Sequence, residues 1–132
     1  MLCNLDDRNA EKVKPIAEIF SEEKLAEKRI LVEMEYLREL GRAGVIRERR
    51  EIREIKINFA RLKEIEKEIN HDVKAVEYYL REELGRGGRA ELGRFVHFGI
   101  CSEDVNNLAY WLMLKEGKEV LLGKIGEIRE KM

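Results

Sequence analysis

The stretch EEKLAEKRILVEMEYLREL, residues 22–40, decides what kind of fold this chain adopts. Its apolar residues recur three and four positions apart, which is the spacing of one face of an α-helix. Ser21 precedes two glutamates there, the pattern of an N-cap with acidic residues in the first turn. Gly41 and Gly44 are typical of a helix end. The apolar face consists of Leu25, Val32, Tyr36 and Leu40, and it is widened by Ile30, Met34 and Leu37.

The same periodicity continues along the chain on both sides of two short breaks. It predicts further helices over residues 45–69, from about Asp72 onward, and over residues 103–131 with Ser102 as the N-cap. No alternation of period two lasts long enough to indicate a strand, so the sequence predicts an all-α protein. The glycine-rich segment LGRGGRAELG lacks the Lys-Ser/Thr ending of a phosphate loop and is interpreted as a surface loop.

The apolar faces are wide for a chain with so few helices to cover them. The stripe of the expected 45–69 helix has the least cover within 132 residues. The chain is therefore expected to self-associate or to be one part of a larger helical bundle. This stripe consists of Ile52, Ile55, Phe59, Leu62, Ile65 and Ile69.

Composition excludes several classes of function. Charged residues make up 40% of the chain, but the net charge is only −1 and the signs are interleaved, so a nucleic-acid partner is not expected. No apolar run reaches the roughly 20 residues of a membrane-spanning helix, and no signal peptide is recognisable. Two cysteines make no disulfide framework. We expect a soluble, cytoplasmic protein of one domain.

The chain is also poor in reactive side chains. It has no Thr, no Gln and only two serines, Ser21 and Ser102, each with a simpler interpretation as a helix N-cap. A Ser-His-Asp triad is thereby disfavoured, and no Cys/His cluster has the spacing of a zinc site.

Three polar clusters stand at expected breaks or helix starts: LDDRN (5–9), NHD (70–72) and HFGICSED (97–104). Each has a structural explanation: Arg8 as a solvated charge, His71 as a weak cap, His97 as a buried histidine bonded to backbone, and Ser102 as an N-cap. The functional hypothesis is that all three converge on one anion, bound by a helix N-terminus, an arginine fork and histidines. Residue types alone favour the structural explanation.

Longer strings change that balance. Three segments of the chain resemble, in the same order, segments of the N-terminal part of adenylosuccinate lyases, a family of the fumarase/aspartase superfamily. They are LDDRNAEKVKPIAEIFSEE, NHDVKAVEYYL and HFGICSEDVNNLAYWLML. Together they span nearly the whole chain. The resemblance implies the N-terminal helical domain of that fold over residues 1–102, and the start of a long helix of the central bundle over residues 103–132.

The resemblance also implies a function. The family eliminates fumarate from adenylosuccinate, giving AMP, and from the succinyl-carboxamide ribotide of purine biosynthesis. It uses no metal or organic cofactor, and each active site is built from three subunits of a homotetramer. By position, the implied substrate-binding residues are Arg8, Asn9, Asn70, His71, Asp72, His97, Cys101 and Ser102.

The chain departs from the family pattern in three site positions and in length. Asp7 stands for a Gly, Asn9 for a Tyr and Cys101 for a Thr. The family's acid histidine and base serine lie in later segments that these 132 residues do not contain, so no catalytic residue is assigned and the chain alone is expected to be inactive. Two alternatives remain: a non-catalytic helical module that binds a nucleotide or another subunit, and a sister lyase such as argininosuccinate lyase.

Overall fold

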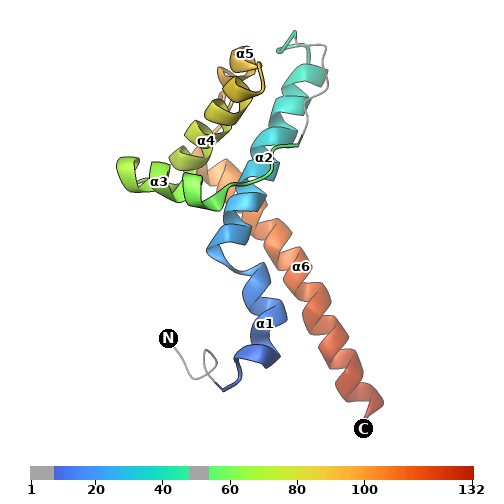
Figure 1. The fold of residues 1–132 in the computed structure, drawn as a ribbon. Helices are drawn as coiled ribbons and strands as arrows, with labels where there is room; N and C mark the ends of the chain where they lie inside the picture. Colours follow the sequence, from blue (N-terminus) through green and yellow to red (C-terminus); the bar gives the residue numbers. More distant parts are fainter. Residues whose placement is uncertain (1–7, 48–53) are drawn as a thin grey trace.

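The computed structural model describes residues 8–47 and 54–132 (Figure 1). The described residues contain helices and connecting loops and no strand, which confirms the all-α class. None of these helices has the length and apolarity to cross a membrane. The elements are α1 (Ala10–Ile19), α2 (Glu22–Arg42), α3 (Phe59–Ile69), α4 (Asp72–Arg86), α5 (Ala90–Gly93) and α6 (Ser102–Glu130).

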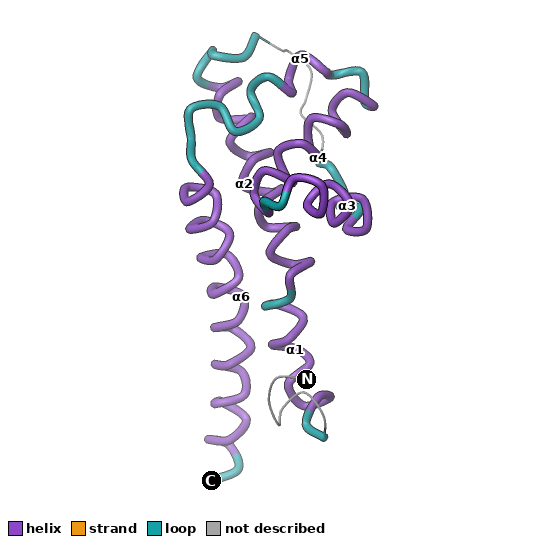
Figure 2. The backbone as a smooth tube through the Cα atoms, turned by 90° about the vertical axis from the view of Figure 1, so that its left-hand side faces the viewer, coloured by secondary structure: helices purple, strands orange, loops and turns teal. Residues whose placement is uncertain are grey.

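The helix α2 is the centre of the arrangement. It packs along α6 on one side and against α4 on the other, while α3 and α5 pack on α4. α4 and α5 lie beside α2, and α3 crosses near the N-terminal end of α2, where Lys63 contacts Glu22 (Figure 1). From that same end, α1 and the second half of α6 extend side by side, away from these helices (Figures 1 and 2). The main apolar core lies where α2, α3 and α4 meet, with Leu37, Tyr79 and Leu80 at most 1% exposed.

The α2 helix confirms the prediction made from residues 22–40. The Ser21 hydroxyl oxygen accepts the backbone N–H of Lys24 at 3.1 Å, as expected of an N-cap. The helix continues through Gly41 to Arg42, two residues past the predicted end. The chain then turns at Gly44, whose φ of 76° is one that a residue with a side chain rarely adopts.

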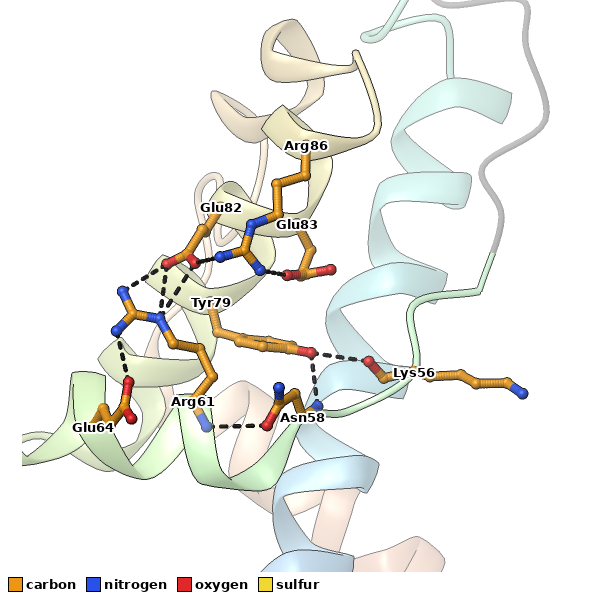
Figure 3. A network of polar contacts seen from close by, with 8 residues as sticks. All are labelled: Lys56, Asn58, Arg61, Glu64, Tyr79, Glu82, Glu83 and Arg86. Atoms are coloured by element: carbon orange, nitrogen blue, oxygen red, sulfur yellow. Dashed lines mark hydrogen bonds and ion pairs between the residues drawn. The ribbon is translucent and has the colours of Figure 1, made fainter.

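The prediction of one helix over residues 45–69 is wrong. Of the described residues in this range, only Phe59–Ile69 form a helix, residues 45–47 and 54–58 do not, and Ile52 lies outside the described residues. Figure 3 shows the hydrogen bonds that the backbone of residues 56 and 58 makes instead of helical ones. The buried Tyr79 hydroxyl accepts the N–H of Asn58 at 2.8 Å and donates to the carbonyl of Lys56 at 2.9 Å.

The Asn58 side chain completes this helix start. Its Oδ1 accepts the N–H of Arg61 at 3.1 Å, which makes Asn58 the N-cap of α3. The Arg61 guanidinium in turn donates hydrogen bonds to the Glu82 carboxylate of α4, with Nη2 2.9 Å from Oε2 (Figure 3). The Glu82 hydrogen bond is the main reason that the pKa of Arg61 lies above its ordinary value. The α3 start is therefore defined by α4, a segment about 20 residues later in the chain.

The exposed apolar surface is also not where the sequence predicts it. Leu62 and Ile65 are buried, and Ile55, Phe59 and Ile69 pack against the main core, so the stripe over residues 55–69 is covered within the chain. The large apolar side chains that remain exposed lie mostly on α6. Those on α6 are Leu108, Tyr110, Trp111, Leu114, Leu121, Leu122, Ile125 and Ile128.

The glycine-rich segment is not one surface loop. The helix α4 continues through Gly85 to Arg86, and the short α5 begins at Ala90. Only the turn between them matches the expectation, with Gly88 at a φ of 69°.

Candidate functional site

The NHD cluster forms the junction between α3 and α4. Asn70 ends α3 in the left-handed conformation (φ 53°, ψ 41°), which asparagine tolerates better than most residues. His71 is the N-cap of α4, and its Nδ1 accepts the backbone N–H of Lys74 at 3.1 Å. The structural explanation of His71 as a cap therefore holds, and the ring's other nitrogen is left for a second contact.

Asp72 is the first residue of α4 and makes two kinds of hydrogen bond. Its Oδ1 accepts the N–H of Val73 at 2.8 Å, and its Oδ2 accepts Nη2 of Arg29 at 2.6 Å. Partial burial alone would raise the pKa of Asp72. The Val73 N–H and the Arg29 guanidinium outweigh burial, so that this pKa lies below its usual value. Asp72 is therefore held as a carboxylate.

Arg29 links the NHD cluster to α6. It is 5% exposed, and its Nε donates to Oδ1 of Asn106 at 2.9 Å while Nη2 contacts Asp72. Arg29 is not among the site residues predicted from the sequence, because it lies in none of the three polar clusters. The signal was present: positions 25, 29, 33, 36 and 40 share one helical face, so Arg29 and Glu33 lie on the apolar stripe itself.

The segment before α6 is held by the same face of α2. Glu33 is fully buried, and its Oε2 accepts the backbone N–H of His97 at 3.0 Å while its Oε1 lies 2.5 Å from Nδ1 of His97. One turn further, the Tyr36 hydroxyl donates to the carbonyl of Phe98 at 2.8 Å. His97 is thus bonded to a buried carboxylate rather than to backbone, and its φ of 61° is left-handed.

The prediction that Ser102 caps α6 is wrong by one residue. Cys101 is the N-cap, and Ser102 is the first residue of the helix. The reason is Asp104, whose carboxylate accepts the N–H of Cys101 at 2.8 Å and thereby closes the first turn one residue earlier. That backbone hydrogen bond is the main cause that lowers the pKa of Asp104. Ser102 is consequently not needed as a cap.

A groove of about 420 Å³ opens at the α3–α4 junction, lined by Asn70, His71, Asp72 and Arg29 among others. Two carboxylates, Glu22 and Glu66, also line it, and Lys63 of α3 contacts both, at 2.6 and 2.9 Å. The groove offers an amide and an imidazole, whereas the N–H groups of Val73 and Lys74 at the start of α4 are already bonded to Asp72 and His71.

The first cluster does not join the other two within one chain. Arg8 precedes α1, and Asn9 is its N-cap residue. At the other end of α1, Phe20 packs so closely on Gly117 that a methyl group there would lie 2.8 Å from the ring. Gly117 lies 15 residues after Ser102, about 22 Å along the helix axis, and α1 runs from there away from α4 (Figures 1 and 2).

We expect Asp72→Asn to weaken the link between α2 and α4. At neutral pH it should lower the free energy of unfolding by about 1–2 kcal/mol, less than a fully buried charge-assisted bond because the Asp72 side chain is half exposed. The folded pKa of Asp72 lies below the ordinary value of 3.8. The extra stability of the wild type over Asp72→Asn is therefore fully present at pH values above 3.8, and it is lost as the pH falls through the folded pKa of Asp72.

Urea unfolding of both proteins, from neutral pH to well below 3.8, measures this difference. The exposed Glu68→Gln is the matched control and should stay close to the wild type throughout. A difference between Asp72→Asn and the wild type that did not shrink in acid would contradict the ion pair with Arg29.

Comparison with known proteins places this arrangement in a family. A model of the lyase family matches residues 7–132. The chain is similar to the adenylosuccinate lyase of Haemophilus influenzae, with 38% identity over 92% of this chain and 30% of that protein. It is 35% identical to the adenylosuccinate lyases of Legionella pneumophila (strain Corby) and Escherichia coli K12, over 94% and 89% of this chain.

The chain spans about 30% of the length of these relatives. The match covers the six helices of the described residues, and their arrangement is the all-α fold expected of the fumarase/aspartase type. This chain belongs to the lyase family.

Proposed function

We propose that this chain is the N-terminal part of an adenylosuccinate lyase, the enzyme that eliminates fumarate from adenylosuccinate and from the succinyl-carboxamide ribotide of purine biosynthesis. The observation that carries the proposal is the 38% identity to an adenylosuccinate lyase over 92% of the chain. The three sequence clusters that resemble that family support it, because their described residues fall at helix starts or helix junctions.

In this proposal the chain binds and orients the substrate. Asn70, His71 and Asp72 belong to one contact surface. His97, Cys101 and Ser102 belong to the other. The contacts that support a common site are those of Arg29, which bonds both Asp72 and Asn106, and so fixes the start of α4 relative to the first turns of α6. The N–H groups of Val73 and Lys74 are already bonded within the start of α4, so the donors of the first surface in this proposal are the Asn70 amide and the His71 ring. The Ser102 hydroxyl is a donor of the second surface, and such donors suit phosphate or carboxylate groups.

Arg8 and Asn9 act in the site of another copy of the chain. The separation of α1 from the α3–α4 junction supports this assignment. The exposed apolar side chains of α6 support the tetramer implied by the family resemblance, because a helix of about 43 Å with such a face needs partner helices.

A second candidate is a non-catalytic module that binds a nucleotide or a subunit. Asn9 and Cys101 favour it, because they replace an aromatic residue and a strong hydroxyl donor of the family pattern. Activity of an assembled enzyme separates the two candidates.

Residues 1–132 alone should release no measurable fumarate from adenylosuccinate. The general acid and base of the elimination lie outside this chain, and the loss of each such group typically costs about 10²–10⁴ in rate. A chimera in which the chain replaces the matching 30% of the Haemophilus influenzae enzyme should restore turnover. Turnover by the isolated chain, abolished by His71→Ala or His97→Ala, would overturn the assignment, and an inactive but tetrameric chimera would favour the module.

The two serines of the chain should behave in opposite ways in that chimera. Ser21→Ala removes the N-cap of α2 and should cost about 1 kcal/mol of stability while leaving substrate affinity unchanged. Ser102→Ala removes no cap and should weaken substrate binding with little change in melting temperature. Thermal melts and KM values measure both effects. A Ser102→Ala protein that melts lower but binds normally would exclude Ser102 from the substrate site.

Association should depend on α6 rather than on α3. Sedimentation of the isolated chain at rising concentration should show oligomers, and Leu114→Glu, at a side chain 60% exposed on α6, should shift them toward monomer. Lys118→Glu on the same helix is the control for added negative charge. A compact monomer at high concentration would contradict the proposal.

A further inference from the structure

The two histidines of the chain use the same ring nitrogen in opposite ways. Nδ1 of His71 lies 3.1 Å from the backbone nitrogen of Lys74, which can only donate. A nitrogen that accepts a hydrogen bond carries no proton, so a neutral His71 has its proton on Nε2. The N-cap contact therefore selects the Nε2–H tautomer of this imidazole.

The contacts of His97 select the other tautomer. Nδ1 of His97 lies 2.5 Å from Oε1 of Glu33, and the backbone N–H of the same histidine donates to Oε2 of Glu33 at 3.0 Å. An ionised carboxylate has no proton to give and accepts at both oxygens. Nδ1 must then be the donor, and a neutral His97 is left with a lone pair on Nε2.

We propose that Glu33 is a positioning residue that holds His97 in the Nδ1–H tautomer, opposite to the tautomer of His71. The fully buried Glu33 contacts both the backbone N–H and the ring Nδ1 of His97. These two contacts fix the orientation of the ring and the left-handed backbone of His97, whose φ is 61°. That conformation is strained for a residue other than glycine and persists only where its surroundings determine it.

Opposite tautomers give the two rings different roles toward a ligand, and this consequence rests on the proposed function. Nε2 of His71 offers an N–H, which suits an anionic or carbonyl oxygen. Nε2 of His97 offers a lone pair, which suits a hydroxyl or amino group of the same ligand. The site would thus distinguish the acceptor groups of its ligand from the donor groups.

The substitution Glu33→Gln tests this role of Glu33, because glutamine has almost the same shape as glutamate. The new amide oxygen can still accept the backbone N–H of His97, but the amide NH₂ must then face Nδ1 and donate to it. Nδ1 becomes an acceptor, and the proton moves to Nε2. The two hydrogen bonds survive while the tautomer inverts, which a purely structural role of Glu33 does not predict.

The measurement is the ¹⁵N chemical shift of the imidazole nitrogens in the labelled chain, at a pH well above the ordinary histidine pKa of about 6.5. The chain has only two histidines, so His71→Asn assigns the signals. In the wild type we expect a protonated Nδ1 in His97 and a protonated Nε2 in His71. Glu33→Gln should invert His97 alone, and Glu33→Asp, which keeps an acceptor-only group, should not. Glu35→Gln on the exposed side of α2 should change neither.

The same tautomer in both wild-type histidines would overturn the proposal, even if every Glu33 variant failed to fold. An unchanged His97 in a folded Glu33→Gln protein would overturn it as well. The spectra require no substrate. Opposite tautomers in a chain whose chimera is inactive would leave this inference standing and reject the lyase assignment alone.

Discussion

The structure depends on a guanidinium that is buried where three helices meet. Burying a charge costs desolvation free energy. For Arg29 this cost is offset by two hydrogen bonds of the guanidinium, from Nη2 to Asp72 of α4 and from Nε to Asn106 of α6. The planar fork sets the directions of these bonds, so it sets the relative placement of two helix starts. A lysine has one mobile donor group in place of the fork and could not define both directions.

The polar contacts of α2 form one line along its apolar face. After Arg29 come Glu33, which holds His97, and Tyr36, which holds the carbonyl of Phe98. The two candidate binding segments are far apart in sequence, but each is fixed to this single rigid helix. A site built on such a helix is placed more accurately than one built on loops alone.

Local signals in the sequence predicted the fold well, and a contact between distant segments accounts for the main error. The Ser21 cap, the α2 face and the α4 start at Asp72 follow from residues within a few positions of each other. Residues 45–69 also had helical spacing, but Tyr79 takes the backbone groups of Lys56 and Asn58, and nothing near residue 58 announces that contact.

The site divides in the same way. Resemblance to known strings pointed to residues 70–72 and 97–102. Arg29 and Glu33 are not among the residues predicted for the site although their spacing puts them on the apolar stripe, and Tyr36 is predicted only as part of that apolar face. The cap of α6 was misplaced by one residue because serine is the better capping residue by type, while the position of Asp104 decides the matter.

The helix α6 has an uneven local stability. Its buried residues, Val105, Ala109, Met113 and Gly117, recur every four positions and stop there, and beyond them the helix includes Gly123 and Gly126. In the 13 residues after Gly117 no side chain is buried and only Val120 is partly buried, and a stretch with so little packing is marginal as a helix in water. Its amide hydrogens should therefore exchange with solvent far faster than those of the first four turns, until neighbouring helices cover that end. Assembly and the folding of this last segment would then be a single event.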